Sequence, residues 1–224
     1  MIPGVKSHLA PLFAPLRLCV KYFSAPRALN DYATHVPVLI GLARLRKIKN
    51  VLEFGCGNYS TLTFLNRAAF PQLERLLSIE NDVAWAETLR ASVKDDERWR
   101  LELVEGEISD SVAELNLEAF DLILIDDSKT SAQRAATIRN VVRKQPRHPW
   151  IVIHDFEVDE YQQAASSFQR CHRFRAYNPE TGLMWNNGNG PSKPKALNRI
   201  LKNNAGALAP DDIEGWIKSC PAFL

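Results

Sequence analysis

Acidic and imidazole side chains stand in two short runs, each at the end of an apolar segment of the sequence. Asp126 and Asp127 close the run FDLILIDD, and His154 and Asp155 lie near the end of WIVIHDF. A histidine beside a carboxylate can accept a proton near neutral pH, since the unperturbed pKa of imidazole is about 6.5. The same oxygen and nitrogen atoms could instead hold a divalent metal ion. General-base catalysis and metal binding are therefore both open for these two runs.

A glycine-rich turn follows another apolar segment. In VLEFGCGNYST, Gly55 and Gly57 lie just past the run and Glu53 lies within it. Glycine lets a ligand approach the backbone closely, and such a turn between a strand and a helix is typical of nucleoside binding. A dinucleotide site would require G-x-G-x-x-G, but Ser60 stands at the third glycine position. Glu53 would also repel a pyrophosphate, whereas it suits a ligand that carries a cation.

A carboxylate that could hold a ribose closes the next extended run, RLLSIE. Glu80 lies 80 − 57 = 23 positions past Gly57, close to the distance of about 20 expected of an acid that accepts both ribose hydroxyls. The other polar or flexible residues at these segment ends are Asn58, Asn81, Gly106 and Glu107. Because ligands of parallel sheets bind at the carboxyl ends of the strands, we expect all of these residues at one edge.

The elements that position these residues alternate between extended and helical patterns from about residue 31. We expect strands at 50–54, 75–80, 100–106, 120–127 and 150–156, and a terminal hairpin from 172–178 and 181–187. Helices are expected at 31–45, from Ser60 with Ser and Thr as caps, at 83–93 after the capping residue Asp82, at 131–144 and at 160–170, with a helical turn at 109–115. The pattern predicts an α/β fold with a doubly wound, mostly parallel seven-stranded sheet and a terminal antiparallel hairpin. The most apolar strand, 120–127, is expected near the sheet centre.

The composition is that of one globular domain. The chain has 224 residues, of which 46% are hydrophobic and 24% charged, and the net charge of +2 gives no push toward nucleic acid. We expect an N-terminal extension at 1–30, a catalytic domain at 31–190 and a C-terminal extension at 191–224 packed on it. Four scattered cysteines indicate neither a zinc finger nor a disulfide framework, which favours a reducing, cytoplasmic location. No apolar run approaches the roughly 20 residues of a transmembrane helix.

The motifs taken together resemble those of the class I S-adenosylmethionine-dependent methyltransferases. The resemblance covers about residues 35–187 and rests on E-x-G-x-G, the acid that closes the second strand, VEGE after the third and DLILID on the fourth. It implies S-adenosylmethionine as the cofactor, with its amino-acid end and sulfonium beside Glu53, Gly55 and Gly57. The ribose would lie at the second strand end, Glu80 and Asn81, and the adenine beside Gly106 and Glu107.

The sequence departs from the family pattern in the turn. The family often has a third glycine where Tyr59 stands here, so Ser60 and Thr61, together with Asn58, are expected to complete the cofactor cradle. Glu107 replaces the more usual aspartate of the loop after the third strand.

Methyl transfer from a sulfonium is an in-line displacement, so the enzyme mainly aligns the acceptor and takes up a proton where one is released. The residues expected at the methyl side are Asp126, which also borders the cofactor, His154 and Asp155. In metal-dependent O-methyltransferases, which this fold resembles, the last pair is Asp-Asn. A divalent metal is therefore possible but not favoured, and no metal ligands are assigned. His35 could reach over the cofactor or be a structural residue. Trp185 and the amides of Asn186, Asn187 and Asn189 could line an acceptor pocket or belong to a turn.

The sequence thus favours a methyltransferase that acts on oxygen of a small-molecule or sugar-like acceptor. A nucleotide-binding oxidoreductase is one alternative, which the missing third glycine and Glu53 disfavour. A non-catalytic binding protein that retains the fold is the other. The sequence does not determine the oligomeric state or the acceptor.

Overall fold

The structure, a computed structural model, describes residues 31–201, apart from positions 94, 129, 187, 189, 192, 193, 196, 199 and 200. The expected N-terminal extension at 1–30 and the part of the expected C-terminal extension beyond residue 201 therefore lie outside the described residues. So do Asn187 and Asn189 of the possible acceptor pocket.

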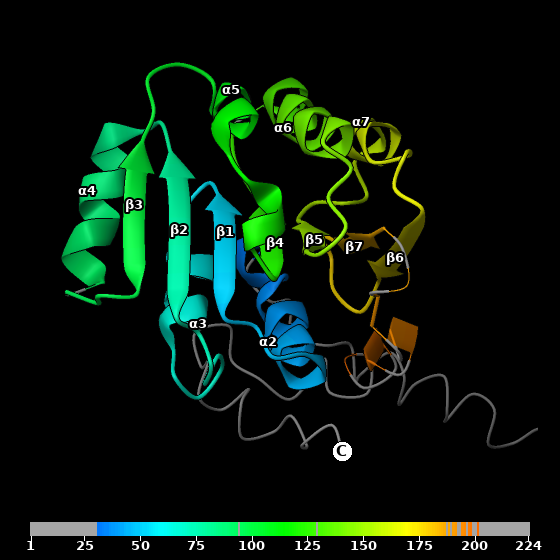
Figure 1. Ribbon diagram of the computed structural model, residues 1–224, viewed down its shortest axis with the longest axis horizontal. Coiled ribbons are helices and arrows are strands. Elements are labelled where there is room, and N and C mark those ends of the chain that lie inside the picture. The colour runs from blue at the N-terminus through cyan, green and yellow to red at the C-terminus, as the bar shows by residue number, and fades with distance from the viewer. Residues whose placement is uncertain are drawn as a thin grey trace, which may run out of the picture.

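A seven-stranded sheet forms the centre of the molecule, in the order β3-β2-β1-β4-β5-β7-β6 (Figure 1). Strands β1 to β5 are parallel, and β7 is antiparallel to both β5 and β6. The predicted fold class, the central position of β4 and the terminal hairpin are confirmed. The strands are β1 (Asn50–Phe54), β2 (Arg75–Glu80), β3 (Trp99–Leu103), β4 (Leu122–Ile125), β5 (Trp150–Ile153), β6 (Arg170–Phe174) and β7 (Thr181–Trp185).

Helices connect the parallel strands and cover both faces of the sheet. They are η1 (Asp31–Ala33), α2 (Val36–Leu45), α3 (Ser60–Leu65), α4 (Val83–Ser92), α5 (Ile108–Ser111), η2 (Val112–Glu114), η3 (Leu117–Ala119), α6 (Ser131–Arg143) and α7 (Asp159–Ala164). Asp82 caps α4 as predicted, since its carboxylate accepts the backbone N–H of Trp85 at 3.0 Å. The expected caps of α3 were wrong, because Tyr59 holds the cap position and no side-chain cap bond forms there. Within the described ranges, no helix is long and apolar enough to cross a membrane.

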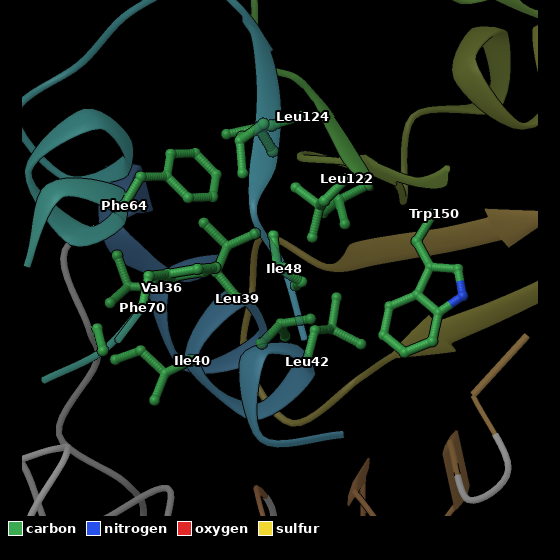
Figure 2. Close-up of a cluster of buried hydrophobic side chains, with 14 of the residues drawn as sticks. Val36, Leu39, Ile40, Leu42, Ile48, Phe64, Phe70, Leu122, Leu124 and Trp150 are labelled. Atoms are coloured by element: carbon green, nitrogen blue, oxygen red, sulfur yellow. The ribbon is translucent and has the colours of Figure 1, made fainter. Parts of the chain in front are cut away.

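Alternate residues of each central strand face two separate cores. On one face, Leu122 and Leu124 of β4 pack with Leu39 and Leu42 of α2 (Figure 2). On the other face, Ile123 and its equivalents pack beneath α6 and α7. Fully burying each such side chain stabilises the fold by about 1.5–3 kcal/mol. Because both faces are covered, the central strands read as continuous apolar runs.

The alternation continues into the polar residues just past β4 and β5. Counted in steps of two along β4 and β5, Asp126 and His154 fall on the face that packs against α2. Asp127 and Asp155 fall on the opposite face, which packs against α6. The side chain at Asp126 accordingly approaches His35 at the start of α2, and Asp127 binds Thr137 of α6. The sheet therefore sorts the four strand-end groups into two pairs.

Candidate active site

Glu80 ties the turn after β1 to the end of β2. Its Oε2 accepts the backbone N–H of Cys56 at 3.2 Å, and its Oε1 accepts those of Asn81 at 2.8 Å and Asp82 at 3.0 Å. Three backbone donors fix a carboxylate in one orientation. The predicted ribose acid is therefore fixed directly beside the glycine turn.

The two glycines of the turn have different surroundings. Gly55 has φ of +80°, and a Cβ there would lie 2.6 Å from the carbonyl oxygen of Asp126. Only glycine lets β1 turn so close to the end of β4. A Cβ on Gly57 would instead meet just the Ser60 hydroxyl, at 3.4 Å, among the described residues. Gly55 thus serves the fold, whereas Gly57 borders open space that a ligand can fill.

Glu53 lies wholly buried beneath the start of α3. Its Oε2 accepts the hydroxyls of Thr61 at 2.8 Å and Ser78 at 2.7 Å, and the Thr61 oxygen accepts the backbone N–H of Gly57 at 3.1 Å. Burial raises the pKa of Glu53 to about 7, although the hydroxyls around it, including that of Ser60, favour its charged form. Glu53 and Thr61 therefore support the turn from below.

The loops after β2 and β3 are joined at their tips. Asn81 Nδ2 donates to the carbonyl oxygen of Gly106 at 2.7 Å, and Gly106 adopts φ of +91°. Glu107 is exposed, and its Oε1 accepts from Gln133 Nε2 of α6 at 2.9 Å. Asn58 is exposed at the tip of the glycine turn. The structure thus brings the expected ribose and adenine residues to one rim of the sheet.

A second cluster lies at the ends of β4 and β5. His154 Nδ1 lies 3.2 Å from the Asp126 carboxylate, and Nε2 lies 2.8 Å from Thr34 Oγ1. Burial alone would lower the pKa of His154, but Asp126 and Asp155 outweigh it and raise that pKa. The His154 side chain is 4% exposed and the Asp126 side chain 19%. A buried chain of polar contacts thus ends in a carboxylate that a ligand can reach.

Arg134 of α6 links the carboxylates of this cluster. Its Nη2 lies 3.0 Å from Asp126 Oδ1, its Nη1 donates to Asp155 Oδ2 at 2.7 Å and its Nε donates to the carbonyl oxygen of Asp127 at 2.7 Å. The guanidinium also lies over the Tyr161 ring, 5.4 Å from its centroid. Although burial opposes it, the attraction of His154 and Arg134 holds the pKa of Asp126 well below its ordinary value. Arg134 thus bridges two neighbouring acids and helps to keep Asp126 ionised.

His35 lies against the same cluster from the start of α2. It is 1% exposed, its ring centroid lies 4.6 Å from that of His154, and its Nδ1 lies 3.9 Å from Asp126 Oδ2. Neither ring nitrogen has a hydrogen-bond partner among the described residues. Burial and the neighbouring His154 lower the pKa of His35 to about 3, so the ring is neutral at physiological pH.

Asp127 lies apart from this cluster, although the sequence places it next to Asp126. Its carboxylate is fully buried and accepts the hydroxyls of Thr137 at 2.7 Å and Ser128 at 3.0 Å. Burial raises its pKa. Asp127 therefore anchors α6 to the sheet, and Asp155 alone of that pair reaches the cluster.

The possible assignment of Trp185 and Asn186 to an acceptor pocket is wrong, because these two described residues lie away from the site. Since β7 runs antiparallel to β5, its last residues lie beside the amino end of β5, opposite the strand ends of the site. Asn186 is buried there, and it donates to the Pro146 carbonyl oxygen at 3.0 Å.

Three residues of the site were missed from the sequence. Arg134 could have been found, because it shares a buried helical stripe with Ala135, Ile138 and Val141, where a charge requires a partner. Thr34 gave no signal, since its contact with His154 spans 120 positions. Trp85 gave none either, but its indole Nε1 donates to the Cys56 carbonyl oxygen at 2.6 Å and so braces the glycine turn.

Glu53→Gln is expected to remove a pH dependence of stability. Because its pKa rises from 4.5 to about 7 on folding, the native state keeps a proton that the unfolded state has lost between those values. The free energy of unfolding of the wild type should fall across this window by up to about 3 kcal/mol and then level off. Urea unfolding at a series of pH values measures this. The exposed Glu105→Gln is the control, and parallel curves for wild type and Glu53→Gln would contradict the prediction.

Arg134→Met is expected to destabilise the fold by about 3 kcal/mol or more, because it leaves two neighbouring carboxylates without their cation. Arg143→Met on the same helix is the matched control, since Arg143 is exposed and should change stability by no more than about 0.5 kcal/mol. Chemical unfolding of both variants makes the comparison. Equal losses would show that the guanidinium bridge contributes nothing beyond the helix itself.

A family model described as a methyltransferase domain matches residues 52–156. No curated protein sequence matches the chain. Among solved structures, human Methyltransferase-like protein 13 in complex with SAH is similar at 16% identity and a TM-score of 0.54, covering 78% of this chain and 93% of that one. Cofactor-bound Rv0187 from MTB is similar at 19% identity and a TM-score of 0.53, covering 82% and 98%.

A spermidine synthase in complex with the transition state analogue AdoDATO is similar at 17% identity and a TM-score of 0.52, covering 83% of this chain and 72% of that one. Likeness at this level concerns the fold, and this last name is not that of a methyltransferase, so the acceptor has to be argued from the site. Residues 52–156 therefore match a model of a methyltransferase domain, and the part of the chain that the structure describes has the fold of these solved structures.

Proposed function

We propose that this domain binds S-adenosylmethionine over β1 and β2 and methylates an oxygen atom of a small-molecule or sugar-like acceptor over β4 and β5. The observation that carries the proposal is the two-part edge of the sheet. An open glycine turn fixed beside Glu80 is followed, two strands along, by partly exposed carboxylates backed by His154.

The residues present suit the cofactor. The open space at Gly57 accepts a group packed against the backbone, and the oriented Glu80 carboxylate suits a ribose diol. The charge of Glu53 beneath the turn favours a cationic ligand, and its raised pKa leaves it ready to ionise beside one. When bound, S-adenosylmethionine supplies an electrophilic methyl group on a sulfonium. Asn58, Ser60, Thr61, Asn81, Gly106 and Glu107 complete the proposed cofactor side.

The charges at the other end support oxygen as the acceptor atom. A hydroxyl group must lose its proton during methylation, and a neutral amine need not lose one before it attacks. Asp126 and Asp155 are 19% and 30% exposed at their side chains, and each can accept a hydrogen bond from an acceptor hydroxyl. The released proton would pass to the Asp126–His154 pair. Paired carboxylates also suit the adjacent hydroxyls of a polyol.

Titration with S-adenosylhomocysteine and with NAD tests the cofactor. A ligand of the native state raises its stability, by about 2.7 kcal/mol at 100 times the dissociation constant, so the first compound should raise the melting temperature and NAD should not. Gly57→Val should fold normally and lose this response, because its side chain enters only the open space. Gly188→Val is the control, since a Cβ there meets no described atom within 4 Å. A response to NAD alone would favour an oxidoreductase, and no response at all would favour a non-catalytic protein.

A screen with methyl-labelled S-adenosylmethionine tests the acceptor. Hydroxyl compounds should take up label in preference to amines and thiols. Asp126→Asn should keep the affinity for S-adenosylhomocysteine and lower the turnover number by about 10²- to 10⁴-fold, the range for loss of general acid–base catalysis. Label that enters amines first, with turnover unaffected by the Asp126→Asn change, would refute oxygen methylation at this cluster.

A further inference from the structure

We propose that His35, His154 and Asp126 form a binding site for a borderline transition-metal ion of the Zn²⁺ class. The three residues come from the start of α2 and the ends of β5 and β4, and each offers one ligand atom within 4.8 Å of the others. His35 distinguishes this cluster from a chance group of acids. It is a buried imidazole beside Asp126 and His154, and neither of its ring nitrogens has a hydrogen-bond partner among the described residues.

The spacing of the ligand atoms is close to that of a tetrahedral zinc site. Two ligands that each lie about 2.0–2.2 Å from the ion are about 3.3–3.5 Å apart. Asp126 Oδ2 lies 3.2 Å from His154 Nδ1 and 3.9 Å from His35 Nδ1. Small side-chain rotations therefore bring all three donors to one ion. The Asp126 side chain is 19% exposed, so the cluster can be reached from solvent.

The partners that orient metal ligands are already present. A metal-bound histidine usually donates its other N–H to a hydrogen-bond acceptor. His154 Nε2 lies 2.8 Å from Thr34 Oγ1, and the Thr34 hydroxyl can donate onward to the carbonyl oxygen of Asp31 at 3.4 Å. The contact with Thr34 thus favours the His154 tautomer that carries its proton on Nε2 and leaves Nδ1 free for an ion. Asp126 is held in the same way, since Arg134 contacts Oδ1 and leaves Oδ2 available.

The donor set selects the class of metal. Two imidazole nitrogens and one carboxylate oxygen suit zinc and its neighbours, whereas Mg²⁺ prefers oxygen ligands. Two carboxylates, those of Asp126 and Asp155, face the single guanidinium of Arg134, so the cluster with both imidazoles neutral retains one negative charge for a cation. This set therefore differs from the oxygen-rich Mg²⁺ site that the strand-end acids alone would make.

This inference deepens the proposed function. Only the role of the bound ion rests on that function. An ion at this place would occupy His154 Nδ1 and Asp126 Oδ2, so it would replace this pair as proton acceptor and instead activate the acceptor hydroxyl as a Lewis acid. The binding itself stands on the three side chains and can be measured without any methyl transfer.

Metal analysis of the tag-free full chain tests the site. After loading with Zn²⁺ and dialysis, the wild type should retain about one equivalent, as a single site of this kind requires. Loading with Co²⁺ should give visible d–d absorption. His35→Leu should lower the Zn²⁺ affinity by more than the roughly 10- to 100-fold that loss of a ligand's hydrogen-bond partner causes. An excess of Mg²⁺ should displace neither ion.

The matched control is His148→Leu, which removes an imidazole 3.0 Å from the Asp121 carboxylate at the other end of the sheet and should leave the affinity unchanged. Without metal, His35→Leu should melt at or above the wild-type temperature, because it removes a buried group that has no partner. Lower melting of that variant, equal Zn²⁺ affinity in it, displacement by Mg²⁺ or no retained metal in the wild type would each overturn the proposal. Titration of the same samples with S-adenosylhomocysteine reports separately on the cofactor side.

Discussion

Repulsion among acids at one end of a sheet is the constraint on which the site depends. Five carboxyl groups gather where β1, β2, β4 and β5 end, and each is compensated by different means. Backbone N–H groups hold Glu80, hydroxyls and a raised pKa accommodate Glu53, and two hydroxyls together with the nearby Arg134 charge serve the buried Asp127. Asp126 and Asp155 share the Arg134 guanidinium. Of these five acids, Asp126 and Asp155 are the ones left partly exposed, over β4 and β5.

The order of the elements and the edge that carries the site follow directly from the sequence. Continuous Leu and Ile in β4 predict a strand covered on both faces, and alternating helices predict parallel neighbours, so the strand-end residues had to meet. The period of two could also have separated Asp126 from Asp127, since Leu124 and Ile125 face opposite cores. Strands β4 and β5 end earlier than expected, at Ile125 and Ile153, because the polar residues after them turn into loops.

The contacts that give the acids their different properties depend on distant parts of the chain. His154 meets Thr34 across 120 positions, and Arg134 reaches Asp155 across 21. No local propensity encodes such pairs, because they exist only once helices have packed on the sheet. His35 illustrates this, since its sequence allows a structural residue or a ligand, and only the positions of Asp126 and His154 distinguish the two. The reversed direction of β7 likewise removed Trp185 from the site.

Helix α2 carries His35, yet it lies outside residues 52–156, which match the family model. Helix α2 packs between the sheet and the segment that contains Leu197. A Cβ on Gly41 would lie 2.5 Å from Leu197 Cδ1, and Leu197 is almost fully buried. Strand β7, also outside the match, covers the edge of β5. The segment that matches the family model is therefore not closed by its own residues in this chain. Flanking segments from both sides cover one face and one edge of its sheet, and the first of them also brings His35 to the strand ends.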